Sequence, residues 1–159
     1  MFVVDTNILL YAADRDAPEH AACRDLVLKW RAGTSPWYLT WGIIYEFLRV
    51  ATHRNVFRKP LTLSEAWGFI EAVLASPSVR VLVETDRHDH LASEVFDGMP
   101  AMVGNLLFDA HAAILMQEHG VKRIYTRDSD FRRFPFLEVV DPMHVSAKRK
   151  QKPTTDKPG

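Results

Sequence analysis

The sequence is poor in cysteine and contains no long apolar run. Cys23 is its single cysteine, so no internal disulfide can form. No stretch of apolar residues reaches the roughly 18 to 20 that a membrane-spanning helix needs. The first residues also lack a basic region followed by a cleavable apolar segment. These absences exclude a disulfide-stabilised scaffold and an integral membrane protein, and we expect a soluble protein of the cytoplasm.

The sequence has no net charge, but its charges are unevenly distributed. Over 159 residues, 20 Lys and Arg balance 20 Asp and Glu. After Ala147 the chain reads KRKQKPTTDKPG, whose five basic residues and one acid give +4 and leave −4 for the rest. A segment with prolines and no large apolar residue cannot bury enough surface to order itself. We expect a domain over residues 1–144 and a disordered basic tail over residues 145–159, which serves solubility or attracts nucleic acid.

Short apolar runs alternate with helical patterns along the chain. Strands are predicted at residues 2–4, 37–39, 79–83, 121–125 and 137–140. Helices are predicted at residues 19–31, 40–53, 62–75, 87–97 and 105–120. Within the third of these helices, Thr62 stands three residues before Glu65, which is a capping signal. The alternation predicts a single α/β domain with a mostly parallel central sheet and helices on both faces.

Acidic residues directly follow two of the predicted strands. Residues 2–4 form a continuous apolar run that stops on Asp5, and Asp128 and Asp130 follow the strand at 121–125. In open α/β sheets the carboxyl edge is where ligands bind, so acids there are candidate functional groups. For Asp128 and Asp130 an ordinary turn is the alternative, because Asp and Ser cap helices and form side-chain turns.

Two further acids lie on predicted helices. Asp109 shares a helix face with Leu106 and Met116, and an isolated buried carboxylate is costly unless it is paired or binds metal. A rotated helix that leaves Asp109 in solvent is the alternative. Glu46 is ambiguous, because Arg49 lies three residues further on and an ordinary ion pair explains it equally well.

Asp5, Glu46, Asp109 and Asp128 together indicate more about function than any one of them does alone. If they converge at one edge of the sheet, each raises the pKa of the others unless a cation neutralises them. Oxygen ligands without histidine or thiolate neighbours suit Mg²⁺ or Mn²⁺ and do not suit zinc. The sequence therefore predicts an acidic site for a divalent metal.

Four stretches of the chain, in this order, resemble the PIN-domain ribonucleases, and in particular the VapC-type toxins of bacterial VapBC toxin–antitoxin pairs. The stretches are VVDTNILLYA, YEFLRVATHRNVFRKPLTLSEA, GNLLFDAHAAILMQEHGV and IYTRDSDFRRFPFLEVVDP, and the resemblance spans residues 1–142. It implies a catalytic set consisting of Asp5, Glu46, Asp109 and Asp128. Of these, the metal ligands are Asp5, Asp109 and Asp128. The accessory residues are Thr6, Asn7, Thr126 and Asp130.

The resemblance also implies the activity. Family members cut RNA, so we expect hydrolysis of phosphodiester bonds by a water that Mg²⁺ or Mn²⁺ activates, with inhibition by a cognate antitoxin. Acids cannot hold RNA, and the basic residues near them that are candidates for phosphate contacts are Arg49, Arg54, Arg58 and Arg127. The alternative for each is a solvated surface charge. Trp37, Tyr38 and Trp41 either stack on unpaired bases or belong to the core or a dimer contact.

Two apolar segments predict protein partners. PWYLTWGIIYEFL and LTLSEAWGFIEAVLA carry more large apolar groups than one face of a small domain usually hides. We expect a homodimer, and a groove near the acids that accepts an antitoxin segment whose Arg or Lys enters the carboxylate site.

Other classes of protein remain as alternatives. A phosphoacceptor domain needs an acid pair after the first strand and a lysine after a late one, where this chain has Thr6, Asn7 and Arg127. A structure-specific DNA nuclease needs additional DNA-binding segments. A PIN-type RNA-processing nuclease outside a toxin–antitoxin pair stays open, and so does a PIN fold that is only a binding scaffold, although the intact acids argue against the latter.

Overall fold

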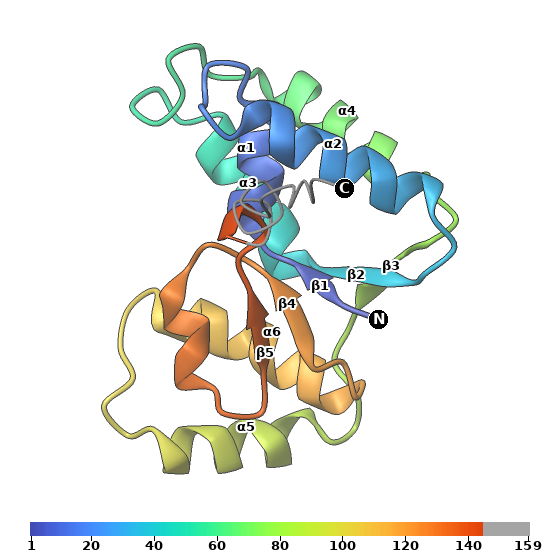
Figure 1. Ribbon diagram of the computed structural model, residues 1–159. Coiled ribbons are helices and arrows are strands. Elements are labelled where there is room, and N and C mark those ends of the chain that lie inside the picture. Colours follow the sequence, from blue (N-terminus) through green and yellow to red (C-terminus); the bar gives the residue numbers. More distant parts are fainter. Residues whose placement is uncertain (145–159) are drawn as a thin grey trace, which may run out of the picture.

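Five parallel strands form the sheet of the computed structural model, which describes residues 1–144 (Figure 1). The strands lie in the spatial order β3-β2-β1-β4-β5. Their bounds are β1 (Val3–Val4), β2 (Trp37–Thr40), β3 (Val79–Leu82), β4 (Arg123–Tyr125) and β5 (Glu138–Val140). All five coincide with predicted strands, so the α/β class and the parallel sheet are confirmed. The predicted basic tail at 145–159 lies outside the described residues.

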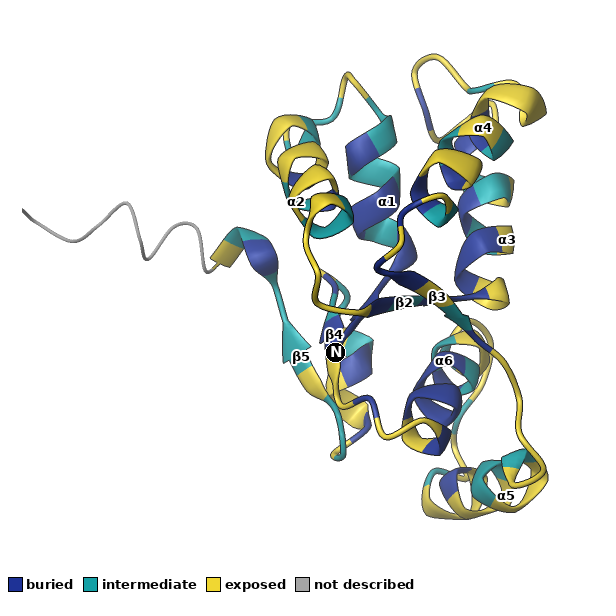
Figure 2. Cartoon of the chain, turned by 90° about the vertical axis from the view of Figure 1, so that its right-hand side faces the viewer, coloured by how far each residue is buried: buried dark blue, intermediate teal, exposed yellow. Residues whose placement is uncertain are grey.

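The helices cover both faces of this sheet. Figures 1 and 2 show α1, α2, α3 and α4 on one side and α5 and α6 on the other. Their bounds are α1 (Thr6–Ala13), α2 (His20–Ala32), α3 (Trp41–Ala51), α4 (Leu63–Leu74), α5 (His88–Gly98) and α6 (Leu106–Glu118), and a 3-10 turn, η1, spans Ser129–Arg133. In the described range 1–144, no helix has the length and apolar character to cross a membrane.

Helix α1 was not predicted, whereas η1 is the capped turn that the sequence offered as the alternative at Asp128 and Asp130. The sequence ILLYAA at residues 8–13 continues the apolar run of β1 with little polar interruption, so its periodicity is weak. The backbone changes direction at Asp5, whose side chain caps the first turn of α1. Local capping chemistry therefore ends β1 and begins the helix.

Strand β1 occupies the centre of the sheet. Val3 pairs with Tyr38 of β2 and with Ile124 of β4, and both Val3 and Val4 are wholly buried. A strand that is paired on both edges and covered on both faces has a continuous apolar sequence. The acid that follows such a strand is brought directly to the carboxyl edge of the sheet.

Aromatic rings fill the core beside β1. The ring of Phe2 packs against those of Trp30, Trp37 and Tyr125, with centroid distances of 4.9 to 6.3 Å. Trp37 is wholly buried and its Nε1 donates to Ser78 Oγ at 3.2 Å. A role for Trp37 in stacking on RNA bases is therefore contradicted, and its alternative role in the core is confirmed.

Two predicted helix ends have the expected chemistry. Thr62 and Glu65 form the reciprocal capping box at the start of α4. Gly120, just after α6, has a φ of +66°, which other residues adopt only with strain. These local signals identify the boundaries of α4 and α6 without help from tertiary structure.

The C-terminal end of α6 is anchored by a buried acid. Glu118 Oε1 accepts hydrogen bonds from the Thr85 backbone nitrogen at 2.9 Å and from Thr85 Oγ1 at 2.6 Å, and Glu118 Oε2 lies 2.7 Å from His88 Nδ1. The loop between β3 and α5 is thereby fastened to α6. Glu118 satisfies its hydrogen bonds inside the protein, unlike the acids at the opposite end of the helix.

Candidate metal centre

Asp5 lies at the junction of β1 and α1, and three hydrogen bonds hold its carboxylate. Oδ1 accepts from the Thr6 backbone nitrogen at 2.7 Å. Oδ2 accepts from Asn7 Nδ2 at 2.7 Å and from Thr126 Oγ1 at 2.6 Å. Because each carboxylate oxygen has two lone pairs, one acceptor position remains on Oδ1. Asp5 is thus rigidly oriented and retains one place for a ligand.

The Thr126 hydroxyl connects β1 to β4 through side chains. Its Oγ1 donates to Asp5 and accepts from Asn7 Nδ2 and from the Asp128 backbone nitrogen, both at 2.9 Å. The Asn7 side chain in turn accepts at Oδ1 from the Arg127 backbone nitrogen at 3.2 Å. The residues predicted as accessory therefore hold the segment after β4 against the start of α1.

Three carboxylates come together beside this network. One oxygen each of Asp109, Asp128 and Asp130 lies within 4.8 Å of the others. Asp128 Oδ1 also accepts from the Asp130 backbone nitrogen at 2.8 Å, which folds the two acids of this turn toward each other. We call this group the carboxylate triad. Asp130, predicted as accessory, belongs to it, whereas Asp5 adjoins it.

Glu46 contacts Arg49, as one prediction had it, and also Thr6, a contact that was not predicted. Its Oε2 accepts from Thr6 Oγ1 at 2.9 Å, and its Oε1 lies 3.6 Å from Arg49 Nη2. The ion pair and the approach to the acidic site were alternatives in the sequence, and the structure contains both. α3 therefore contributes an acid that lies next to the first turn of α1.

The electrostatics reflect this crowding. Burial, which is the largest cause, and the nearby carboxylates together raise the pKa of Asp109 from 3.8 to about 7; these carboxylates are Asp5, Asp128, Glu46 and Asp130. Burial also raises the pKa of Asp5 to about 6, although hydrogen bonds from Thr126 and Thr6 oppose the change. Of the predicted elevations, those of Asp5 and Asp109 are present, and a bound cation would reverse them.

A cavity of about 480 Å³ opens beside these acids. It is lined by Asp5 and Glu46 and by Asp109 of α6, together with Tyr45, Arg49, Phe108 and His111. Tyr45 directly precedes Glu46, and Phe108 directly precedes Asp109. Sequence reasoning missed these two aromatic residues, and the available signal was an aromatic residue placed immediately before an acid on each helix.

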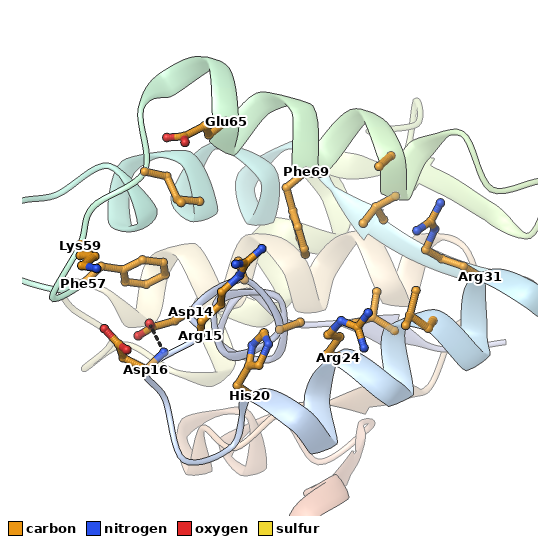
Figure 3. Close-up of a pocket in the computed structure, with 17 residues that line it drawn as sticks. Asp14, Arg15, Asp16, His20, Arg24, Arg31, Phe57, Lys59, Glu65 and Phe69 are labelled. Carbon is orange, nitrogen blue, oxygen red and sulfur yellow. Dashed lines mark hydrogen bonds between the residues drawn. The ribbon is translucent and has the colours of Figure 1, made fainter.

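A larger cavity, of about 650 Å³, lies elsewhere, between α1, α2 and α4 (Figure 3). Its lining includes the basic residues Arg15, Arg24, Arg31 and Lys59 and the apolar residues Val27, Phe57, Phe69 and Val73. Among the residues that the structure describes there, none was predicted as a site residue. Size alone therefore does not identify the chemical site, and the smaller cavity holds the acids.

The basic residues predicted to contact RNA differ in their surroundings. Arg127 donates to Glu19 and lies 5.7 Å from the centre of the Tyr11 ring. Arg49 pairs with Glu46 at the rim of the acidic cavity. Arg54 and Arg58 are exposed in the segment between α3 and α4. RNA contact by any of the four stays a prediction.

Known proteins share this fold and sequence. A profile of the PIN domain matches residues 2–137, which defines the class of the domain. Ribonuclease VapC48 of Mycobacterium tuberculosis is 34% identical over 138 residues, covering 87% of this chain and 94% of VapC48. VapC ribonuclease Mb2897 of Mycobacterium bovis is 32% identical over 143 residues, covering 90% of this chain and 96% of the relative. The chain therefore belongs to the VapC group of the PIN-domain family.

Solved structures agree on the fold. VapC20 of Mycobacterium tuberculosis, described as a sarcin-ricin loop cleaving toxin, aligns with a TM-score of 0.63 at 21% identity over 87% of this chain and 98% of VapC20. VapBC2 of Rickettsia felis, solved with a DNA fragment from its promoter, aligns with a TM-score of 0.59 at 14% identity over 87% of this chain and 96% of that one. Both likenesses show the same PIN architecture.

The raised pKa of Asp109 predicts a pH-dependent stability of the metal-free protein. The unfolded carboxyl titrates near 3.8 and the folded one near 7, so the folded state binds more protons between these values. Stability should therefore fall as the pH rises through this window, with no further loss from this group above it. Asp109→Asn should remove that loss, so the variant should exceed the wild type in stability at about pH 8 and match it near pH 4.

Thermal unfolding in the presence of a chelator measures this difference. Asp97→Asn, an exposed change on α5, is the matched control and should follow the wild-type curve at every pH. If the stability of the wild type and of Asp109→Asn changed with pH in the same way, the raised pKa of Asp109 would be contradicted.

Proposed function

We propose that this chain is a Mg²⁺- or Mn²⁺-dependent endoribonuclease toxin of the cytoplasm that a cognate antitoxin inhibits. The observation that carries the proposal is the carboxylate triad of Asp109, Asp128 and Asp130, with Asp5 and Glu46 beside it. Membership of the VapC group supports RNA as the substrate, because the named relatives are ribonucleases. Phosphate contacts are assigned to Arg49, Arg54, Arg58 and Arg127.

The donor set fits a hard divalent cation. In the described part of the chain, the grouped ligand atoms are carboxylate oxygens, without imidazole or thiolate. Asp109, Asp128 and Asp130 would hold the ion, and Asp5 would add its remaining Oδ1 position. Such an ion supplies Lewis acidity, which lowers the pKa of water and stabilises charge on the leaving oxygen.

The remaining residues have positional roles. Thr126 and Asn7 hold the Asp5 carboxylate in one orientation. Thr6 Oγ1 donates to Glu46 Oε2 and orients the Glu46 carboxylate, which would accept a proton from the attacking water. Glu46 is thus assigned to proton transfer, and the triad is assigned to metal binding.

Two alternatives are distinguished from this proposal by simple observations. A non-catalytic scaffold does not need carboxylates whose pKa values are raised by one another, so the intact acids disfavour it. An RNA-processing nuclease outside a toxin–antitoxin pair has the same chemistry. A small upstream reading frame that encodes a DNA-binding segment and a C-terminal helix would decide for the toxin.

The first test of the function is metal-dependent RNA cleavage. Asp109→Asn and Asp128→Asn should each lower the cleavage rate by at least about 100-fold, because each removes a charged ligand of the ion. The rate is measured on labelled RNA with Mg²⁺, with Mn²⁺ and with a chelator. Wild-type protein should also melt at a higher temperature in millimolar Mn²⁺, and Asp109→Asn should lose most of that gain.

Asp97→Asn again serves as the control and should cleave RNA at the wild-type rate. Undiminished cleavage in the chelator, or equal rates for wild type and both triad variants, would refute the metal-dependent mechanism.

Inhibition by an antitoxin is proposed to use a cation. Burial and the neighbouring acids oppose ionisation of Asp109 and raise its pKa to about 7, and a cation in this space would favour the charged form. An Arg or Lys side chain that enters this space would displace metal and form charge-assisted hydrogen bonds to Asp5 or Asp109. The antitoxin would then inhibit by occupying the site, without reshaping it.

Alanine substitution of the partner's C-terminal peptide tests this mode of inhibition. Replacement of one basic residue should weaken inhibition by about 10-fold or more, since hydrogen bonds to charged groups are the strong ones. Substitution of the neighbouring polar residues serves as the control. Equal inhibition by every alanine variant would reject the cationic mode.

A homodimer is the remaining part of the proposal. Large apolar side chains stay exposed in both segments that the sequence singled out, with Trp41 on α3 and Leu63 on α4. Surplus apolar surface of this kind marks interfaces. Sedimentation of the isolated protein at tens of micromolar should report a dimer, and a monomer at that concentration would reject it.

A further inference from the structure

Two exposed aromatic rings stand at the mouth of the acidic cavity. Tyr45 of α3 is 67% exposed and Phe108 of α6 is 71% exposed, and both line the cavity that contains Asp5, Glu46 and Asp109. Aromatic side chains are usually among the most buried in a protein. Here each precedes a site acid by one residue, so helix geometry turns the ring to one side of the carboxylate.

The Tyr45 ring has a neighbour that limits its movement. Trp41, four residues earlier on α3, has its ring centre 6.2 Å from that of Tyr45, at an interplanar angle of 45°. Residues four apart on a helix lie one above the other, so Trp41 packs along one side of the Tyr45 ring. The ring is thereby held in place although most of it is exposed.

The cations of the same cavity are already paired. Arg49 lies 3.6 Å from Glu46, and His111 Nε2 lies 2.8 Å from Glu84 Oε1. Paired cations attract a phosphate less strongly than unpaired cations do, and the neighbouring acids repel a phosphate. The remaining binding surface of the cavity is aromatic, and every nucleobase has a π face that stacks on such rings.

We propose that Tyr45 and Phe108 hold an unpaired nucleobase beside the scissile phosphate by stacking. This inference rests on the proposed ribonuclease function and deepens it, because it assigns the choice of substrate to two residues. A base inside a duplex is covered on both faces by its neighbours, so only a base free of the stack reaches these rings. The pair therefore selects unpaired positions in RNA for cleavage.

A second copy of the chain is the other occupant that such rings would suit. Glu46 and Asp109 lie directly beside the two aromatics, and burial of these carboxylates in a dry protein interface would be costly. An RNA strand with its accompanying cations leaves the acids solvated or neutralised. The adjacent charge therefore favours RNA over a second copy of the chain.

The test compares Tyr45→Ala and Phe108→Ala with Phe96→Ala, which removes an exposed phenylalanine from α5, away from the cavity. Each of the first two variants should lower kcat/KM on single-stranded RNA by about 10-fold, mainly through KM, because stacking supports binding. Phe96→Ala should match the wild type. Tyr45→Phe keeps a ring face and should regain most of what Tyr45→Ala loses.

A substrate with an abasic ribose beside the scissile phosphate tests whether the rings act on the base. Removing the base and removing a ring are compared singly and together, as in a double-mutant cycle. The abasic substrate should bind more weakly to the wild type, and Tyr45→Ala or Phe108→Ala should weaken its binding little further. Binding is measured by fluorescence anisotropy in Ca²⁺ and therefore does not depend on turnover. The Mn²⁺-induced rise in melting temperature should be unchanged in both alanine variants, since neither supplies a ligand.

The outcomes separate the two levels of the proposal. If the wild type cleaves no RNA but still binds the intact substrate more tightly than the abasic one, the ribonuclease function alone is refuted. Normal cleavage by both alanine variants, or an equal loss on the intact and abasic substrates, would overturn the stacking assignment alone. A shift from dimer to monomer in Tyr45→Ala or Phe108→Ala during sedimentation would assign the rings to an interface between copies and also overturn it.

Discussion

The repulsion among the carboxylates at one edge of the sheet is the constraint on which the site depends. At Asp5 and Asp109, burial opposes ionisation most, and the neighbouring acids add to this effect. Neutral donors hold Asp5 in place, chiefly the hydroxyl of Thr126 and the amide of Asn7. These donors orient its carboxylate without neutralising it, so a cation can still bind there.

A site of this kind accepts any cation that reaches it in suitable geometry. A metal ion and the side chain of an arginine or lysine relieve the same repulsion, although only the ion supplies Lewis acidity. In the proposed function, catalysis and inhibition would thereby be two responses to one electrostatic condition. Competition between them requires no change in the positions of Asp5, Asp109 or Asp128, because both occupants would use the charge that the fold already concentrates.

The sequence predicts the fold well where local chemistry and periodicity agree. The five strands, the capping box at Thr62 and the helix end at Gly120 follow from local signals. Asp109 was identifiable because it interrupts an apolar helix face. Helix α1 was missed because its apolar residues continue those of β1, and only the cap at Asp5 separates the two elements.

Tertiary contacts decide the rest of the site. The sequence left Glu46 undecided, because periodicity reveals the face of a helix and does not reveal that Thr6 lies opposite. Asp130 belongs to the triad because Asp128 accepts a hydrogen bond from its backbone and closes the turn. Tyr45 and Phe108 were overlooked because exposure is a property of the folded surface, and the same residue type at Phe47 is wholly buried.

The central position of β1 has a consequence for the order in which the site is assembled. Asp5 emerges from the ribosome well before its hydrogen-bonding partner Thr126, which lies 121 positions later in the chain. Domains fold during synthesis from the N-terminus onward, and pairings of such long sequence separation form last. A nascent chain on the ribosome therefore lacks the edge at which the acids meet until β4 and the turn after it have emerged. An RNA-cleaving protein built in this way would remain inert toward the messenger and the ribosome that produce it until β4 and this turn have been made.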